Sequence, residues 1–163
     1  MRYLDNVNQS ITERRDIVIE TAFKLFAENR IEPVTMTVVA NNCNMGVASI
    51  YRYFGTKKEL VIAVAAKKWR EYYGELQRHY NELNVEKMTA AQELEFYIDR
   101  YIDLYKENSD LLNFNANFSI YIGSEDTTKD EMKPYNSIID KFVNKFHMLY
   151  KKAQDDKTVR TDI

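Results

Sequence analysis

The chain has 163 residues, of which 45% are hydrophobic and 29% are charged, and it carries a net charge of −2. This balance excludes an intrinsically disordered chain and suits a globular protein with a buried core, while the net charge alone gives no sign of nucleic acid. No apolar run approaches the ~20 residues of a membrane span, and residues 1–10 lack the apolar core of a secretory signal, so we expect no membrane partner. The single Cys43 cannot form an internal disulfide, so we expect a protein of the reducing cytoplasm.

Helix-breaking residues are scarce, because the chain has only 4 glycines and 2 prolines. Helix starts are marked by the capping-box pattern, in which Ser or Thr is followed three residues later by Glu or Gln. Such boxes begin at Ser10, Thr56 and Thr89, and Ser109 with Asp110 offers a further cap. Between these positions apolar residues recur every three or four residues, and no stretch alternates as a strand would. We therefore expect an all-α protein with roughly seven helices.

The first helix is expected to begin at Ser10 and to end before Pro33, which cannot continue it. Residues 35–54 then carry two short apolar patterns, separated by the polar joint N-N-C-N-M-G. Asn44 suits a left-handed turn, and Gly46 can cap the second short helix. Two short helices across a sharp turn, preceded by a longer supporting helix, predict a helix-turn-helix.

The second short helix would turn Ala48, Ser49 and Arg52 outward. Small side chains let a helix sit deep in a major groove, a serine can donate to a base or phosphate, and an arginine can bind guanine or phosphate with two bonds. Tyr51 and Tyr53 flank the arginine and point in different directions around the helix, so some of these side chains must face solvent or a partner.

The stretch TMTVVANNCNMGVASIYRYFGTKKEL at 35–60, with FKLFAE at 23–28, resembles the DNA-binding signature of TetR-type (tetracycline-repressor) transcriptional regulators. The resemblance covers residues 10–62 and keeps its register across three helices and two turns. It implies a three-helix DNA-binding head at 1–55 and a helical ligand-binding and dimerisation body at 56–163, truncated at its C-terminus. It also implies a homodimeric repressor that a small-molecule effector releases from a palindromic double-stranded DNA operator.

The resemblance also implies which residues contact DNA. Hydroxyl groups at the start of the second helix would touch phosphate, and so would a lysine at the start of the fourth helix, where the helix N-terminus adds positive potential. Ile50 and Phe54 would hold the recognition helix in the head. The implied DNA-binding residues are Thr35, Thr37, Gly46, Val47, Ala48, Ser49, Tyr51, Arg52, Tyr53 and Lys57.

Three positions depart from the family pattern, which usually has glycine near Arg30, Asn44 and Ala48. Asn44 can adopt the turn conformation without glycine, and Asn29 can end the first helix in place of one. The recognition helix carries a single charge, that of Arg52, so its sequence does not specify an operator.

The aromatic stripes of the later helices allow two interpretations, ordinary core packing and the wall of a ligand pocket. Arg100 lies among these rings and would pair either with an acidic ligand or with a nearby carboxylate. That carboxylate could be Glu93, Glu95 or Asp103. The polar stretch at 123–134 is expected to be a loop. The candidate ligand-binding residues are Trp69, Tyr73, Phe96, Arg100, Phe114, Phe118 and Phe142.

The sequence offers no support for an enzyme, a cofactor or a metal site. It contains no G-x-G-x-x-G, no phosphate-binding loop and no G-x-S-x-G. His79 and His147 lie far apart without metal-ligand spacing, and the single Cys43 is interpreted as a small apolar residue of the head. The alternative to a DNA-binding regulator is a helical protein–protein interaction module, which the weak positive charge of the recognition helix leaves open.

Overall fold

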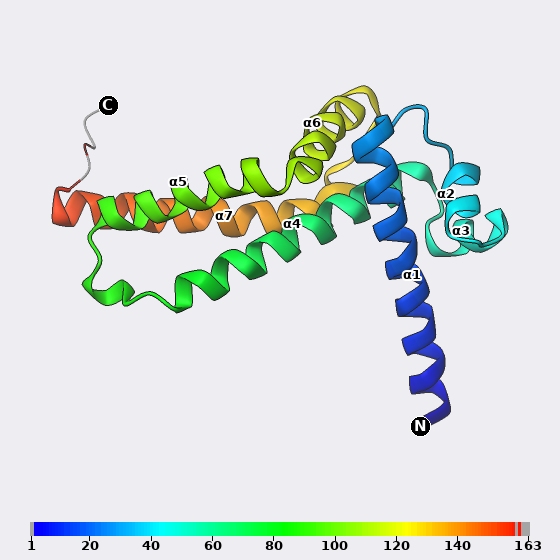
Figure 1. Cartoon of the computed structure of the whole chain (residues 1–163), viewed down its shortest axis with the longest axis horizontal. Coiled ribbons are helices and arrows are strands. Elements are labelled where there is room, and N and C mark those ends of the chain that lie inside the picture. The colour runs from blue at the N-terminus through cyan, green and yellow to red at the C-terminus, as the bar shows by residue number, and fades with distance from the viewer. Residues whose placement is uncertain (1, 159, 161–163) are drawn as a thin grey trace. The chain divides into compact units, whose positions relative to one another are not determined.

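The computed structural model describes residues 2–158 and 160. Over these residues the chain is all-α, as predicted, with no strand (Figure 1). The helices are α1 (Arg2–Asn29), α2 (Met36–Asn42), α3 (Val47–Tyr53), α4 (Lys57–Asn81), the short 3-10 helix η1 (Val85–Lys87), α5 (Ala90–Glu107), α6 (Ser109–Ser124) and α7 (Lys129–Asp156). In the described part of the chain, no helix is long and apolar enough to cross a membrane.

The chain folds as two compact units. Met1–Ala65 and Asp110–Met132 form the first unit, which holds α1, α2, α3, the beginning of α4 and α6. Ala66–Ser109 and Lys133–Ile163 form the second, which holds the rest of α4 together with α5 and most of α7. The boundaries of these units differ from those of the domains expected at 1–55 and 56–163. The expected domains are functional regions, and they remain a prediction.

Helix α1 begins at Arg2, so the prediction that the first helix begins at Ser10 was wrong. No glycine or proline lies between these two residues, and a capping residue begins a helix only where the preceding chain leaves the helical path. At the other end the helix stops at Asn29, and Arg30 has a φ of 64°. Arg30 itself therefore takes the left-handed position that commonly holds glycine after a helix.

The helix-turn-helix is built by local hydrogen bonds. The backbone N–H of Val38 donates to the hydroxyl of Thr35 at 3.2 Å, which caps the start of α2. Asn44 has a φ of 53°, as the turn prediction required, and Met45 N–H then donates to the carbonyl of Ala40 at 3.0 Å. These bonds set the sharp turn between α2 and α3 without a glycine at its tightest point.

Aromatic packing attaches α6 to the first unit. The ring of Phe114 lies 5.6 Å from that of Phe23 and 6.4 Å from that of Phe26, between centroids. Phe26 and Phe114 are fully buried, as are Ile50 and Phe54 from the helix-turn-helix. Burial of each such side chain contributes about 1.5–3 kcal/mol, so the core of the first unit extends well beyond its three N-terminal helices.

The expected loop at 123–134 is mostly helical, so that prediction was wrong. Helix α6 runs to Ser124 and α7 begins at Lys129, which leaves only four residues between them. The hydroxyl of Thr128 accepts a bond from Glu131 N–H at 3.3 Å, and the Glu131 carboxylate accepts one from Thr128 N–H at 2.8 Å. The overlooked sequence T-K-D-E is therefore a capping box, and Pro134 is tolerated near the start of α7.

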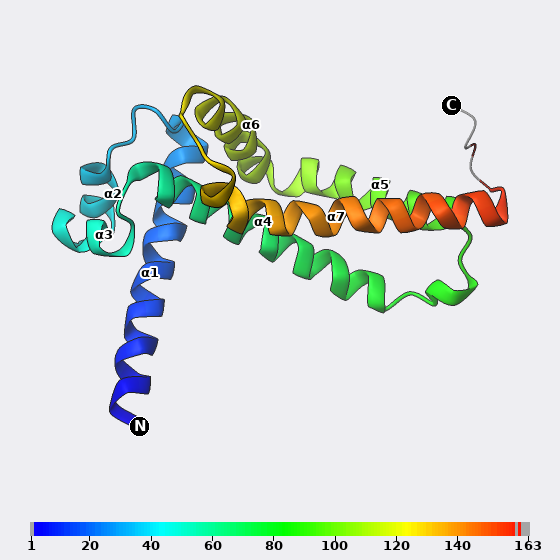
Figure 2. The same cartoon turned by 180° about the vertical axis from the view of Figure 1, so that it is seen from behind.

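In the second unit, α5 and α7 lie side by side with the later part of α4 (Figures 1 and 2). The predicted capping box at Thr89 is present at the start of α5, because the Thr89 hydroxyl and the Gln92 side chain cap each other's backbone amides. A compact apolar cluster joins the three helices. Its buried members are Leu76, Tyr80, Ala90, Tyr97, Leu149 and Ala153.

Candidate DNA-binding surface and apolar cavity

Helix α3 presents two different faces. Ile50 is fully buried in the first unit, and Phe54, which follows the helix, is buried beneath the guanidinium of Arg15 at 4.6 Å. Ala48, Tyr51 and Arg52 are exposed, and the exposed fraction of Tyr51 is 49%. The two residues expected to anchor the helix therefore do so, and the side chains expected to meet DNA remain accessible.

Ser49 and Arg52 contact each other on α3. The guanidinium of Arg52 donates to the hydroxyl of Ser49 at 3.2 Å, across one turn of the helix. A guanidinium held by a neighbouring side chain loses less freedom when it binds a base or phosphate. Val47, Ser49 and Tyr53 are half-buried at the edge of this surface, and Gly46 is exposed at its start.

The remaining predicted DNA contacts begin α2 and α4. Thr35 and Thr37 are exposed at the start of α2, and the hydroxyl that caps the helix can still donate its own hydrogen. At the start of α4, Lys57 donates to the backbone carbonyl of Glu32 at 2.8 Å and lies 5.5 Å from the ring of Tyr121. A phosphate contact would require this ammonium group to exchange the carbonyl for a phosphate oxygen.

The environment of Lys57 is partly buried. Burial lowers the pKa of its ammonium group, and the carboxylates of Glu32 and Glu125 offset only part of that effect. Its neighbour Lys58 pairs with Glu131 at 2.7 Å and also donates to the carbonyl of Asp126. Both lysines of the T-K-K-E sequence are thus held by other parts of the first unit.

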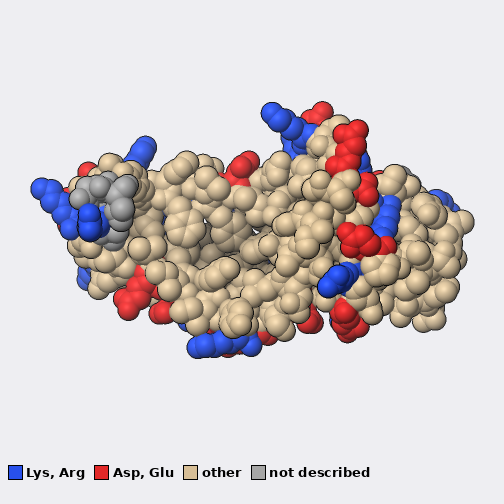
Figure 3. Space-filling view, turned by 90° about the horizontal axis from the view of Figure 1, so that it is seen from above, with Lys and Arg blue, Asp and Glu red and all other residues tan. Residues whose placement is uncertain are grey.

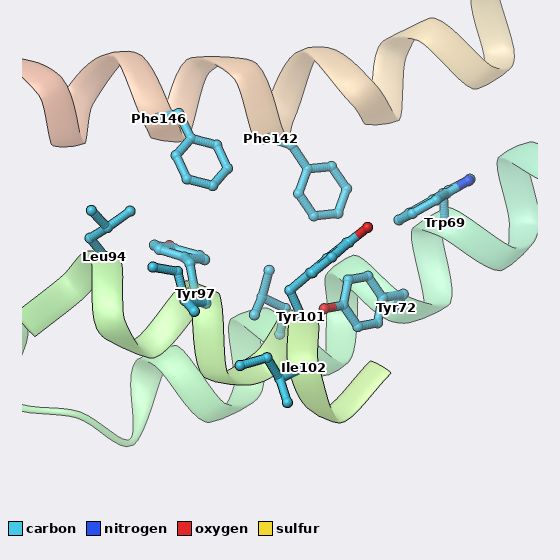
Figure 4. A pocket seen from close by; sticks show the side chains of 10 residues that line it. Trp69, Tyr72, Leu94, Tyr97, Tyr101, Ile102, Phe142 and Phe146 are labelled. Carbon is cyan, nitrogen blue, oxygen red and sulfur yellow. The ribbon is translucent and has the colours of Figure 1, made fainter. Parts of the chain in front are cut away.

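A cavity of about 340 Å³ lies in the second unit, between α4, α5 and α7 (Figure 4). Figure 3 shows a hollow in one face of this part of the molecule, surrounded by uncharged residues. Six aromatic and four aliphatic side chains line the cavity. They are Trp69, Tyr72, Leu76, Leu94, Tyr97, Ile98, Tyr101, Ile102, Phe142 and Phe146.

The structure brings only two of the predicted ligand-binding residues, Trp69 and Phe142, to the cavity wall. Phe114 and Phe118 lie in the core of the first unit, where their rings are 6.0 Å apart. Arg100 pairs with Asp103 at 2.7 Å, which confirms the carboxylate interpretation of that arginine. It lines a separate polar cavity of about 240 Å³ between α4 and α5.

Tyr73 and Phe96 pack behind the apolar cavity. Tyr73 meets Phe142 edge-on at 5.0 Å, and Phe96 lies 5.3 Å from Tyr97. Sequence reasoning missed Tyr72 as a lining residue, and the candidate set left out Tyr97, Tyr101 and Phe146, which belong to the aromatic stripes considered for a pocket wall. The helical spacing identified the stripes that carry these rings, but the direction of each ring depends on its neighbours from other helices.

A buried carboxylate lies close to the cavity. Glu93 is 4% exposed, accepts a bond from the hydroxyl of Tyr80 at 2.5 Å, and pairs with Lys152. Lys145 donates to the same tyrosine hydroxyl at 2.6 Å. Burial alone would raise the pKa of Glu93, but the bonds from Lys152 and Tyr80 and the charges of both lysines hold it below its usual value. This cluster ties α4, α5 and α7 together.

The described residues contain no group of three His, Cys, Asp or Glu side chains that could hold a metal ion. The fold and the site thus define a helix-turn-helix protein with a helical body that contains an apolar cavity. Residues 18–64 match the family model described as bacterial regulatory proteins, tetR family. The matched segment runs from α1 through α2 and α3 into α4, so the helix-turn-helix region of the chain is similar to that family's DNA-binding fold.

Part of the chain is also similar to a curated transcriptional regulator. Over 91 residues the chain is 26% identical to the HTH-type transcriptional regulator SAB2452 of Staphylococcus aureus (strain bovine RF122 / ET3-1). The match covers 53% of this chain and 49% of that protein, so the chain spans about half the length of this relative.

Solved structures share the fold over most of the chain. The fatty acid degradation regulator FadR from Bacillus halodurans matches with a TM-score of 0.69 and 13% identity, over 92% of this chain and 72% of its own. A regulator from Saccharomonospora viridis in complex with choline matches with a TM-score of 0.72 and 18% identity, over 93% and 75%. FadR from Bacillus subtilis in complex with stearoyl-CoA matches with a TM-score of 0.64 and 17% identity, over 90% and 74%.

Proposed function

We propose that the chain is a transcriptional repressor that binds a palindromic double-stranded DNA operator as a homodimer and is released by a small-molecule effector. It would act in the cytoplasm, where the genome is, and without enzymatic activity. The observation that carries the proposal is the contact between the exposed Arg52 and the half-buried Ser49 on α3, within the segment that matches the tetR family model. The cavity of the second unit supports an effector site.

In this proposal α3 enters the major groove. Ala48 allows close approach, while Ser49 and Arg52 contact base edges or phosphates. The residues around them position the helix on the sugar–phosphate backbone. Those positioning residues are Thr35, Thr37, Gly46, Val47, Tyr51, Tyr53 and Lys57.

A homodimer would place two copies of α3 in successive major grooves, one helical turn apart, which explains why the operator should be an inverted repeat. An effector would relieve repression only by binding the form that does not fit DNA more tightly than the form that does. Choline and stearoyl-CoA, named with two of the matched structures, are examples of molecules that related folds bind.

The test is selection of bound duplexes from a random DNA pool. The wild-type chain should enrich an inverted repeat, and Arg52→Ala should weaken binding to it by ~1–3 kcal/mol, or about 5–150-fold, if Arg52 contacts a base. Arg78→Ala is a matched control, because Arg78 is exposed at the end of α4 in the second unit. It should leave the enriched sequence and its affinity unchanged.

No enrichment by a chain that is folded and dimeric would contradict the proposal. That outcome would favour the helical protein–protein interaction module, which the single charge of the recognition helix and the engaged Lys57 ammonium group leave as the second interpretation.

A further inference from the structure

We propose that the cavity between α4, α5 and α7 binds an uncharged, apolar small molecule of compact size. The inference rests on the proposed function, because it names the chemical class of the effector for that function. It depends on the chemistry of the cavity wall, on the position of the charges around it, and on its dimensions.

The wall offers a ligand almost no polar group. All ten described lining residues are aromatic or aliphatic, and none carries a charge. The hydroxyl of Tyr72 already donates to the backbone carbonyl of Arg100 at 3.2 Å, and that of Tyr97 is buried without a hydrogen-bond partner, so it is the polar group that a ligand could still meet. A charged ligand group placed here would lose its hydration without gaining an oppositely charged partner, which costs several kcal/mol.

Two lysines of α7 contact rings that do not line the cavity. Lys145 sits 3.9 Å from the ring of Tyr80, and Lys141 sits 5.5 Å from that of Tyr73. Lys145 is also 3.7 Å from the carboxylate of Glu93, which pairs with Lys152 as well. Two lysines against one carboxylate leave this cluster with an excess of positive charge.

This arrangement disfavours ligands of either sign. A cation would gain ~0.5–2 kcal/mol from the aromatic faces, but it would meet no lining carboxylate and would approach the two lysines. An anion would find no lining ammonium or guanidinium group, and it would face the negative side of the aromatic rings. An uncharged molecule gains from burial of its apolar surface without either cost.

The rings also set the shape of the cavity. Phe142 and Phe146 project from α7 toward Tyr97 and Tyr101 on α5, as Figure 4 shows. Trp69 closes one end and meets Phe142 edge-on at 5.9 Å. Because these rings support one another, the wall is formed before a ligand enters. The volume of about 340 Å³ is near the lower end of ligand pockets and suits a compact molecule.

Trp69 is the only tryptophan of the chain, so its fluorescence reports directly on this cavity. We would titrate the full chain, without DNA, with three probes that share one apolar frame: 1-adamantanol, 1-adamantanecarboxylate and N,N,N-trimethyl-1-adamantylammonium. Calorimetry would give the same affinities independently. The neutral alcohol should bind at least about tenfold more tightly than either ion, since each ion loses hydration in the cavity.

A substitution in the wall should change this preference. Ile98 lines the cavity and is 50% exposed, so Ile98→Lys can place an ammonium group at the wall while the side chain still reaches water. The variant should lose at least about tenfold in affinity for the alcohol and gain a similar factor for the carboxylate. Ile120→Lys is the matched control, because Ile120 is 66% exposed on α6 of the first unit. It should bind all three probes as the wild type does.

Three outcomes would overturn the inference. These are equal or tighter binding of either ion, no change of Trp69 fluorescence or heat with any probe, and an emission that depends on protein concentration in the absence of probe. The last would mean that a second copy of the chain covers the cavity. Because no DNA is present, failure of operator binding cannot produce these results. If the chain selects an operator but gives one of these three outcomes, the proposed function stands and only the proposed class of ligand is contradicted.

Discussion

Arg52 is the one charged residue between Thr35 and Phe54, so in the proposed complex the electrostatic contact of the helix-turn-helix with DNA would depend heavily on it. In the structure its guanidinium donates to Ser49, which lies one turn earlier on the same helix. The two side chains that sequence reasoning chose for base contacts therefore act as a pair. Their coupling can be measured.

We expect Ser49→Ala to weaken operator binding by about 1 kcal/mol, partly because the hydroxyl no longer orients Arg52. In the Arg52→Ala background the same substitution should reduce the free energy of operator binding by less, because the side chain that Ser49 orients is absent. Fluorescence anisotropy at one fixed salt concentration would give the four affinities of the cycle. Strictly additive losses would show that Ser49 contacts DNA independently of Arg52.

Arg30 is a second residue with a measurable consequence. It holds a φ of 64° directly after α1, a conformation that costs a residue with a β-carbon about 1 kcal/mol. Arg30→Gly should therefore raise the free energy of unfolding by up to about 1 kcal/mol. Urea denaturation would measure the change.

The matched control for Arg30→Gly is the same substitution one residue earlier. Asn29 is the last residue of α1, where glycine relieves no strain and weakens the helix, so Asn29→Gly should lower stability. If both substitutions were destabilising, the left-handed conformation of Arg30 would not be a source of strain.

At the scale of elements, the capping-box pattern predicted a helix start correctly where the preceding chain is not helical, and wrongly where the preceding chain is already part of a helix. Thr56 accepts a bond from Glu59 N–H at 3.0 Å at the start of α4, and the box at Thr89 is complete. The box at Ser10 is inside α1, because no breaking residue precedes it. The box at Thr128 was overlooked because its surroundings are polar, although capping requires only the hydroxyl and the acid three residues later.

The Thr128 box also links α7 to α4 through an ion pair, and this link should depend on pH. The bond from Lys58, with those from Thr128, lowers the pKa of Glu131 from 4.5 to about 2. A lowered folded-state pKa gives stability that is present above the unfolded-state value and is lost as pH falls toward 2. Glu131→Gln should therefore lower the Tm at pH 7, and the difference from wild type should shrink between about pH 4.5 and pH 2.

Thermal unfolding followed by circular dichroism at several pH values would test this. In a Lys58→Met background the effect of Glu131→Gln should be smaller, because the strongest partner of the carboxylate is gone. A Tm difference that stays constant from pH 7 to low pH would rule out the ion pair as its cause.

At the scale of the whole molecule, the two compact units do not follow the order of the chain. Helix α6 comes after α5 in sequence, yet its aromatic residues pack on α1 in the first unit. Its Phe114 is fully buried there, and large-to-small changes at such sites typically cost 3–5 kcal/mol. The core of the first unit thus depends on a segment more than fifty residues beyond its helix-turn-helix.

We expect Phe114→Ala to lower the free energy of unfolding by about 3–5 kcal/mol and to reduce DNA binding through loss of folded protein. Phe146→Ala is the matched control, because Phe146 is 45% exposed in the second unit. Truncation of this side chain creates less new buried empty space than truncation of Phe114, so we expect a smaller loss of stability. Thermal unfolding by circular dichroism, with operator affinity measured on the same samples, would compare them. Equal losses in the two variants would contradict the assignment of α6 to the core of the first unit.

The helical content, the helix-turn-helix, the left-handed Asn44 and the buried Ile50 and Phe54 could all be predicted from the printed residues. These features depend on spacing, capping and turn preferences within a few positions of the chain, which a sequence displays directly. The T-K-D-E box shows that even a missed helix start was visible at this range.

Three features could not be predicted in this way. They are the unit that α6 joins, the carbonyl that holds Lys57 and the rings that line the cavity. Each depends on contacts between segments far apart in the sequence, where helical spacing leaves several ring directions open. Phe114 and Phe142 have the same apolar periodicity, yet one lies in the core of the first unit and the other in the cavity wall of the second. Packing between helices makes that distinction, because it selects which side of each helix is covered and by what.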